Sequence, residues 1–293
     1  MHPQAHQITS PVPEVKTFIH DATVSFIIGN YNHSDFVNDL LWQILSYVEI
    51  PRGWEVEIII SDTGSRQEEL DKIAKFVSKT FELWKQRKIK RVLLVLQDLN
   101  PLRIQRPTFH GYSFALNAGV RCADHDIIIY CDSSIIIPKN FIEEMTKIHY
   151  AETCFLRAGL FNLTKELTEK IRRNRQKYNF DIINEQFLSQ LKPSLGRPAW
   201  SVKRSLFNQL GGMDEEMIDY GAVDDDFVNR IIMCGYKNYQ SPIYVFHQWH
   251  PERRDTNNNR NFSILTKHIQ KRQTIVNSGK KPQFEEKVFI LCR

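Results

Sequence analysis

Cysteine is scarce in this chain of 293 residues, and its five cysteines are widely spaced. No Cys-x-x-Cys pair occurs, so the sequence indicates neither a disulfide framework nor a zinc site, and a reducing compartment fits it best. Long hydrophobic runs are also missing: no stretch approaches the roughly 18 uninterrupted apolar residues that span a bilayer, and the first residues lack the apolar core of a secretory signal. We therefore expect a soluble, cytoplasmic protein; the alternative is an N-terminally trimmed Golgi enzyme, whose sequence would look similar.

The excess of positive over negative charge is small, since 39 Lys and Arg against 34 Asp and Glu leave a formal net charge of +5. Much of this excess lies in two stretches, Lys85 to Arg91 and Lys267 to Lys281. Neither stretch has interleaved aromatic residues and no nucleic-acid-binding module is visible, so we expect no nucleic acid partner. Such runs are usually solvated faces, and they also allow peripheral contact with an anionic membrane or attraction of a diphosphate ligand.

What is present is a repeated step from a short apolar strand to a helix. The predicted strands are Thr23 to Gly29, Val56 to Ser61, Arg91 to Gln97 and Asp126 to Asp132. The predicted helices contain Phe36 to Leu45, Gln67 to Lys85 and Tyr112 to Cys122. Strands that are apolar almost throughout and alternate with helices predict an α/β fold with a largely parallel sheet covered on both faces. Ligands of such sheets bind at the carboxyl ends of the strands.

The second half of the chain is less regular. The elements predicted there are a strand near Cys154 to Leu160, a charged helical segment from about Thr164 to Leu191, a loop from Lys192 to Trp200, a helix from about Asp225 to Cys234 and a strand from Ile243 to His247. Beyond about Asn261 the composition is typical of a polar, partly disordered tail.

Two polar clusters follow predicted strands in the first half. The cluster Ser61 to Ser65 lies where a strand ends and a helix begins. A carboxylate at Asp62 can accept hydrogen bonds from a base or a ribose, whereas the alternative is an ordinary turn and helix cap. Asp132 ends an apolar strand, where a carboxylate needs a cation to satisfy it. A divalent ion would do so and would neutralise a diphosphate; the alternative is again a turn.

Two further clusters lie in the second half. Asp224, Asp225 and Asp226 lead into an apolar helix. The helix dipole stabilises negative charge in a first turn, but capping needs only one of the three. Crowding can raise the pKa of a carboxylate, which suits a general base. His247 follows a strand among aromatic residues. A single histidine there is usually a packed residue, but together with Asp132 it can complete a metal site.

Taken in order, these clusters resemble the GT-A glycosyltransferases, particularly glycosyltransferase family 2 and the C-terminal part of the beta-1,4-galactosyltransferases. VSFIIGNYN is similar to the opening strand and loop of family 2, and SDTGS to its later Asp-Asp-Gly-Ser motif. FALNAGVRCADHDIIIYCDSS resembles the Asn-x-Gly helix and the strand with the Asp-x-Asp metal motif. LGGMDEEMIDYGAVDDDFVNRI resembles the galactosyltransferase pattern. The resemblance covers roughly residues 22 to 250 in patches, and the joint order of the motifs makes it specific.

This resemblance implies a GT-A fold and a role for each matching residue. The implied domains are a leader (1–20), a catalytic domain (21–260, with a nucleotide-sugar-binding half at 21–134 and an acceptor half at 135–260) and a basic tail (261–293). The implied donor-binding residues are Asn30, Asn32, Asp62, Asn117, Asp132, Ser134 and Trp200, with Asp62 at the nucleotide base. The implied ligands of Mn²⁺ or Mg²⁺ are Asp132, Ser134 and His247. Asp224 corresponds to the general base and Asp225 to an acceptor contact.

Three positions depart from the family pattern. Thr63 replaces the second Asp of Asp-Asp-Gly-Ser, Ser134 replaces the last Asp of Asp-x-Asp, and Val223 stands where Glu is usual. Because one carboxylate is left in Asp-Ser-Ser, we expect a metal held by Asp132, His247 and the diphosphate, with weak metal dependence as the alternative. The Gln-x-x-Arg-Trp motif of processive synthases is absent, which favours the addition of one sugar at a time.

The sequence therefore predicts an inverting, non-processive hexosyltransferase of glycan or polysaccharide biosynthesis. It would move a sugar from a nucleotide-sugar donor, with UDP as the expected nucleotide, to a hydroxyl of a glycan, lipid-linked or protein acceptor. Two alternatives stay open. One is a nucleotidyltransferase-like nucleotide-binding enzyme, although no Gly-x-x-x-x-Gly-Lys-Ser/Thr loop supports it. The other is a catalytically inactive carbohydrate-binding protein of the same fold, which the altered motifs make conceivable.

Overall fold

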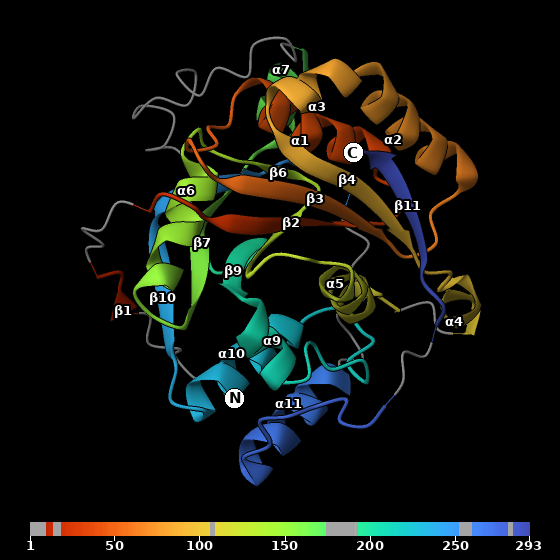
Figure 1. The fold of residues 1–293 in the computed structure, drawn as a ribbon. Helices are drawn as coiled ribbons and strands as arrows, with labels where there is room; N and C mark the ends of the chain where they lie inside the picture. Colours follow the sequence, from red (N-terminus) through yellow and green to blue (C-terminus); the bar gives the residue numbers. More distant parts are fainter. Residues whose placement is uncertain are drawn as a thin grey trace.

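A single mixed sheet runs through the protein, as seen in a computed structural model that describes residues 10–13, 19–105, 109–173, 191, 193–251, 260–280 and 284–293 (Figure 1). Within these residues the strands are β1 (Ser10–Pro11), β2 (Thr23–Asn30), β3 (Glu55–Asp62), β4 (Ile89–Leu96), β5 (Ile127–Asp132), β6 (Ile135–Ile136), β7 (Cys154–Asn162), β8 (Pro193–Ser194), β9 (Ala199–Lys203), β10 (Lys237–His247) and β11 (Lys287–Cys292). The helices are α1 (Ser34–Ser46), α2 (Gln67–Lys79), α3 (Phe81–Gln86), α4 (Asn100–Gln105), α5 (Tyr112–Arg121), α6 (Phe141–Thr146), the 3-10 helix η1 (Lys147–Tyr150), α7 (Lys165–Arg173), α9 (Arg204–Gln209), α10 (Val223–Met233) and α11 (Arg260–Lys271).

The strand order is β1-β10-β7-β9-β5-β2-β3-β4-β11, with β6 paired to β10 and β8 to β7. The neighbours β5, β2, β3 and β4 are all parallel, as the repeated strand-helix steps predict. Antiparallel pairing enters where β9 lies between β5 and β7, and where β11 joins β4. The predicted largely parallel sheet is thus confirmed, with β9 and β11 as the main exceptions.

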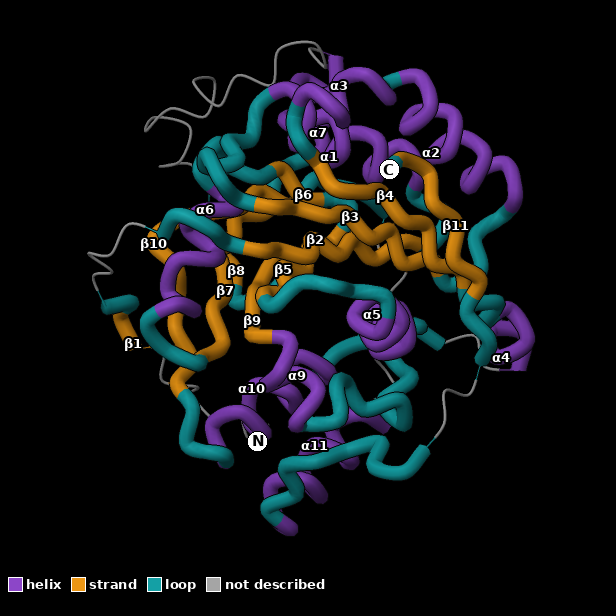
Figure 2. Tube along the Cα trace, viewed as in Figure 1, coloured by secondary structure: helices purple, strands orange, loops and turns teal. Residues whose placement is uncertain are grey.

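Helices cover both faces of the sheet, and Figure 2 shows α1, α2 and α3 on one side and α5, α9, α10 and α11 on the other. Successive side chains of β2 alternate between two apolar cores because strand residues point to opposite faces in turn. Ile28 packs into the core that includes the apolar face of α1, whereas Ile27 packs into the core with α5 and α10. Burial on both faces explains why these strands are apolar almost throughout.

Several element boundaries differ from the sequence expectations. The helix predicted from Gln67 to Lys85 breaks at Thr80, whose hydroxyl bonds to the carbonyl of Phe76 at 2.8 Å and thereby competes with the helical pattern. The loop predicted from Lys192 to Trp200 contains the start of β9. The charged helix predicted from Thr164 is formed as α7 up to Arg173, and the rest of that prediction lies outside the described residues.

The expectation of a partly disordered tail after Asn261 is wrong for the described part of that segment. Helix α11 buries Ile264 and Leu265 against the core, and β11 pairs antiparallel with β4. The interpretation failed because α11 has few apolar positions and because the short apolar run of β11 follows a long polar segment. Whether residues 1–20, 21–260 and 261–293 act as separate units stays a prediction. Among the described residues, no helix is both long and apolar enough to cross a membrane.

Candidate active site

Parallel pairing places three of the predicted site residues on neighbouring strands at one edge of the sheet. Asn30 at the end of β2 is directly opposite Asp62 at the end of β3, and Gly29 is opposite Asp132 at the end of β5. This is the carboxyl edge, where ligands of parallel sheets bind. The register therefore confirms that the first two polar clusters meet.

The Asp62 carboxylate is fully buried and accepts four hydrogen bonds. Its Oδ1 accepts from the backbone N–H groups of Gly64 and Ser65 at 2.9 and 2.8 Å, and its Oδ2 accepts from Asn30 Nδ2 at 2.7 Å and Ser65 Oγ at 2.5 Å. Burial raises the pKa of Asp62, although all four bonds act against that rise. The alternative of a turn is thus confirmed, and a base contact by this saturated carboxylate stays a prediction.

Asn32 organises the same loop from the other strand. Its Oδ1 accepts from the backbone N–H of Arg66 at 2.8 Å, and its own N–H donates to Ser65 Oγ at 2.7 Å. The residue has a φ of 55°, a left-handed conformation that Asn adopts more easily than most residues. Asn30, Asn32 and Asp62 are therefore brought together, and they hold the ends of β2 and β3 in one fixed arrangement.

Asp132 is half-buried and bonded to a residue two positions earlier on the same strand face. The phenol of Tyr130 donates to its Oδ1 at 2.5 Å. Burial raises the pKa of Asp132 to about 7, the hydrogen bond from Tyr130 lowers it, and the nearby charge of Asp224 raises it. A carboxyl with this pKa is only partly ionised at neutral pH, which makes the approach of a cation favourable.

Asp224 belongs to the first turn of α10 and is held by an aromatic side chain from α5. Tyr112 Oη donates to its Oδ1 at 2.6 Å, and Trp200 Nε1 donates to Tyr112 Oη at 3.2 Å. Burial raises the pKa of Asp224 to about 6, whereas the bond from Tyr112 and the charge of Arg197 lower it. The group is positioned and poised for proton transfer near neutral pH.

Two carboxylates thus face one another across a pair of tyrosines. The rings of Tyr112 and Tyr130 meet edge to face with centroids 5.2 Å apart, and each phenol bonds to one of the two aspartates. Burial raises the pKa of both phenols well above the usual range, so both stay protonated and donate. A buried site with two carboxylates of raised pKa can accept a proton at one group and a cation at the other.

The three consecutive aspartates have different surroundings. Asp225 pairs with Arg197 Nη1 at 2.6 Å, and its side chain is 40% exposed. Asp226 is buried and bonds to Arg230 Nε at 2.8 Å and His268 Nδ1 at 2.7 Å. Asp226 therefore serves the core, Asp225 faces outward beside an arginine, and Asp224 is the member that points to the site.

His247 is brought to the segment after Asp132 by the pairing of β10 with β6. It lies opposite Ile135, and the next residue, Gln248, donates its N–H to the carbonyl of Ser134 at 2.9 Å. The Nε2 atoms of His247 and His250 lie 3.3 Å apart, so two imidazoles converge beside this turn. Among the residues that the structure describes, no three His, Cys, Asp or Glu side chains converge closely enough to hold a metal ion alone.

Two of the predicted donor-binding residues, Asn117 and Trp200, are buried among other side chains. Asn117 is buried, and its amide bonds to Met213 N and O, both at 2.9 Å, and to Glu215 Oε1. Trp200 is completely buried among Tyr130, Phe155 and Phe227. Their side chains support a loop and Tyr112 respectively, and direct donor contacts by Asn117 and Trp200 stay a prediction.

Sequence reasoning missed Tyr112, Tyr130, Arg197 and His250. Tyr130 precedes Asp132 by two residues on one strand, and His250 follows His247 by three, so local spacing carried a signal for both. Tyr112 is 112 positions away from the aspartate that it holds, and Arg197 is 28 positions from Asp225. No local pattern could have revealed those two contacts.

Comparison with known families places this geometry in context. Residues 25–211 match the family described as Glycosyl transferase family 2, which is more than half of the chain. The chain belongs to glycosyl transferase family 2. No curated protein sequence matches the chain.

Two solved structures are similar in fold to this family 2 chain. One is the mannosyltransferase PcManGT from Pyrobaculum calidifontis in complex with GDP-Man and Mn²⁺, with 17% identity, a TM-score of 0.51, and coverage of 84% of this chain and 61% of that one. The other is GalNAc-T7 with UDP, GalNAc and Mn²⁺, with 16% identity, a TM-score of 0.55, and coverage of 84% and 48%. The chain spans about half to three fifths of the length of these proteins. The predicted GT-A fold and family are confirmed, and the galactosyltransferase-like motif stays a prediction.

Proposed function

We propose that this family 2 protein is a glycosyltransferase that moves a sugar from a nucleotide-sugar donor to an acceptor hydroxyl, with inversion and one sugar per cycle. The observation that carries the proposal is the pair of carboxylates, Asp132 and Asp224, held by Tyr130 and Tyr112 at the carboxyl edge of the sheet. A glycan, lipid-linked or protein acceptor is compatible with this site.

Asp224 acts as the general base in this proposal. In its ionised form it removes the proton of the acceptor hydroxyl, whose oxygen attacks the anomeric carbon while the bond to the nucleoside diphosphate breaks. One displacement inverts the configuration, and the proton stays on Asp224 until the product leaves. Burial, which raises the pKa of Asp224 to about 6, makes it a stronger base than an exposed aspartate while leaving it mostly ionised at neutral pH.

Tyr112 positions this base. Its phenol is bonded to Asp224 Oδ1 and is itself held by the Trp200 indole, which is fixed by complete burial. These contacts fix the orientation of the Asp224 carboxylate toward an acceptor. Such fixed geometry supplies a large share of rate enhancement in transfer reactions.

We propose that a divalent metal ion binds beside Asp132, with the diphosphate of the donor completing its ligands, since no three His, Cys, Asp or Glu side chains of the described residues converge to hold it. The proposed protein ligands are the carboxylate of Asp132 and the imidazole of His247, with His250 as a further candidate because its Nε2 lies 3.3 Å from that of His247. Mixed nitrogen and oxygen ligands favour Mn²⁺ over Mg²⁺, which prefers oxygen alone. When bound, such an ion would neutralise the charge of the leaving diphosphate. Ser134 is buried next to this set, and its predicted role as a ligand remains a proposal.

The donor is the first property to test. Purified protein is screened by thermal shift against UDP-sugars and GDP-sugars with Mn²⁺, with Mg²⁺ and with EDTA. We expect a UDP-sugar to raise the melting temperature in the presence of Mn²⁺, because a ligand that binds only the folded state stabilises it in proportion to occupancy. No stabilisation by any nucleotide sugar would contradict the proposal.

The base is tested by Asp224→Asn with Asp71→Asn on α2 as the control, since Asp71 is exposed and its carboxylate accepts a hydrogen bond from Gln67 at 2.8 Å. With the donor found in the screen, we expect Asp224→Asn to lower kcat by about a hundredfold to ten-thousandfold, the usual contribution of a general base. Donor affinity is expected to change little. Near-normal transfer by a folded Asp224→Asn protein would show that another group is the base.

A further inference from the structure

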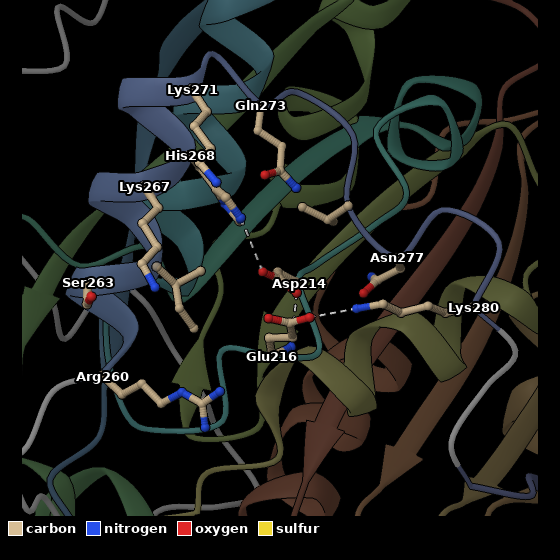
Figure 3. Close-up of a pocket in the computed structure, with 12 residues that line it drawn as sticks. Asp214, Glu216, Arg260, Ser263, Lys267, His268, Lys271, Gln273, Asn277 and Lys280 are labelled. Carbon is tan, nitrogen blue, oxygen red and sulfur yellow. Dashed lines mark hydrogen bonds and ion pairs between the residues drawn. The ribbon is translucent and has the colours of Figure 1, made fainter.

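A cavity lies apart from the two carboxylates, between α11 and the loop that carries Asp214 and Glu216. Its volume is about 300 Å³, and none of Asp132, Asp224 or His247 lines it. Figure 3 shows Arg260 and Lys267 extending from α11 toward this loop, while Lys280 reaches Glu216 from the other side. The proposed transfer reaction has no use for this cavity.

The walls of the cavity carry an excess of positive charge. Arg260, Lys267 and Lys271 are separated by seven and four positions, which puts them on one face of α11. Lys280 is occupied by Glu216 at 2.7 Å. Among the described residues, neither Lys267 nor Lys271 has a hydrogen bond or an ion pair, so two ammonium groups are available to an anion.

The acidic residues that line the cavity do not cancel this excess of positive charge. The only carboxylates in the lining are Asp214 and Glu216. Asp214 is buried and lies 3.6 Å from His268 Nε2, and Glu216 has Lys280 as its partner. Four Lys and Arg side chains therefore face two carboxylates that already have partners, and Ser263 and Gln273 add a hydroxyl and an amide to the lining.

The geometry points to a binding site for a small phosphate-bearing anion. Lysine and arginine form strong charge-assisted hydrogen bonds to phosphate oxygens, and hydroxyl and amide groups complete such sites. A volume of about 300 Å³ lies at the lower end of ligand pockets, which suits pyrophosphate or a sugar phosphate rather than an extended polymer.

The occupant of this site would contact a helix that is bonded to the catalytic turn. His268 Nδ1 bonds to Asp226 Oδ1 at 2.7 Å, and Asn261 Nδ2 donates to the carbonyls of Asp219 and Gly221 at 2.7 and 2.8 Å. Residues 219–226 include Asp224. Binding that orders α11 is therefore expected to order the segment that presents the proposed base, and the site is a candidate for regulation by a phosphate compound.

The test uses pyrophosphate and the intact protein in EDTA, so that metal-dependent binding of a diphosphate at the carboxyl edge is suppressed. Calorimetry is done on the wild type, on Lys267→Gln/Lys271→Gln and on a matched control, Lys75→Gln/Lys79→Gln, which removes the same charge from exposed positions of α2. We expect the wild type and the α2 variant to bind alike and the α11 variant to bind at least about tenfold more weakly.

Hydrogen exchange gives a second readout that does not depend on transfer activity. Pyrophosphate is expected to slow amide exchange in residues 219–226 of the wild type, but not of the α11 variant. Equal binding by the wild type and the α11 variant, or no binding by the wild type, would overturn the proposal. Loss of binding to anionic phospholipid vesicles in the α11 variant, without pyrophosphate binding by the free wild type, would instead assign the cations to lipid headgroups. If no nucleotide sugar binds in the donor screen, the proposed transfer reaction fails, but the pyrophosphate results still decide whether this anion site exists.

Discussion

At the residue scale, the two site carboxylates share a raised pKa and a hydrogen bond from a tyrosine. Burial raises the pKa of Asp132 to about 7 and of Asp224 to about 6, and their mutual charge adds to the shift of Asp132. Each is restrained by a tyrosine whose own phenol stays protonated. The protein thus keeps two acidic groups close together at a cost in stability that a bound cation would relieve.

Removal of the Tyr112 hydroxyl is expected to move the pH profile of transfer. The bond from Tyr112 lowers the pKa of Asp224, so Tyr112→Phe should raise that pKa above about 6 and shift the acidic limb of kcat upward by roughly one pH unit. The profile is measured between pH 5 and 9. Tyr150→Phe serves as the control, because Tyr150 is exposed and its hydroxyl bonds to the backbone of residues 21 and 23 rather than to a site carboxylate. An unshifted limb would mean that Tyr112 does not tune the base.

Asp224→Asn should also change stability with pH. The folded-state pKa of about 6 is above the value of 3.8 expected for an unfolded chain, so the stability of the wild type falls as the pH rises from about 4 to about 6. Asparagine carries no charge and escapes this loss. Urea unfolding in EDTA should therefore give a higher free energy of unfolding for the variant than for the wild type at pH 8, and a similar one at pH 4. In thermal unfolding at pH 8, the melting temperature should rise by about 2–4 °C for each kcal/mol gained. Equal stability at pH 8 would contradict the assigned burial cost.

The sequence predicts which side chains lie together where a strand end fixes their position. Asn30, Asp62 and Asp132 meet because parallel strands bring their carboxyl ends to one edge. Asn117 and Trp200 were assigned by motif alone, and the sequence does not show whether a polar or aromatic side chain turns toward a ligand or into a core. The Tyr112 bond to Asp224 joins α5 to α10, and only the folded chain reveals it.

At the element scale, β2 lacks a side chain where the Tyr130 ring crosses it. A Cβ atom on Gly29 would lie 2.8 Å from the Tyr130 hydroxyl oxygen, closer than real contacts allow. The glycine therefore lets the tyrosine of β5 lean over β2 and reach Asp132. The conformation of β2 itself does not require glycine at this position, since its φ is not positive.

Gly29→Ala is expected to displace Tyr130 and to destabilise the protein by about 1–3 kcal/mol, the usual cost of overpacking a core. In a Tyr130→Phe background the nearest atom would be a ring carbon at 3.4 Å, so the same change should cost clearly less. Urea unfolding of the four proteins closes a double-mutant cycle. Equal costs in the two backgrounds would show that the hydroxyl is not the obstacle.

Elements of the first half were predictable because each apolar strand is buried on both faces and is followed by an amphipathic helix. β9 was missed because it begins inside a segment rich in proline and glycine. β11 has an apolar run from Val288 to Cys292 and was missed because the segment before it is polar. Its pairing with β4 depends on tertiary context rather than on local pattern.

At the scale of the whole molecule, β11 forms one end of the sheet, and among the described residues no strand pairs with its outer side. Three consecutive side chains there, Val288, Phe289 and Ile290, are 48%, 48% and 55% exposed. An apolar edge strand invites pairing with other chains. This edge is therefore where we expect the isolated protein to self-associate.

Ile290→Lys should reduce that self-association without unfolding the protein. An exposed lysine on an edge strand opposes strand pairing between chains, and a surface change of this kind usually alters the free energy of unfolding by no more than about 0.5 kcal/mol. Light scattering at increasing concentration compares the wild type with Ile290→Lys and with Ile290→Val, which keeps the apolar surface. Association that is unchanged in the lysine variant would place the contact elsewhere.

The pairing of β11 with β4 also has a consequence for the order of folding. Val288 lies opposite Val95, so the two strands are roughly 190 residues apart in the chain. Because a ribosome releases the chain from its N-terminus, β4 emerges long before the strand that covers it. The outer edge of β4 must stay open while all the residues that carry the proposed base, Asp224 included, are still being made, and closure of this edge is among the last events of folding.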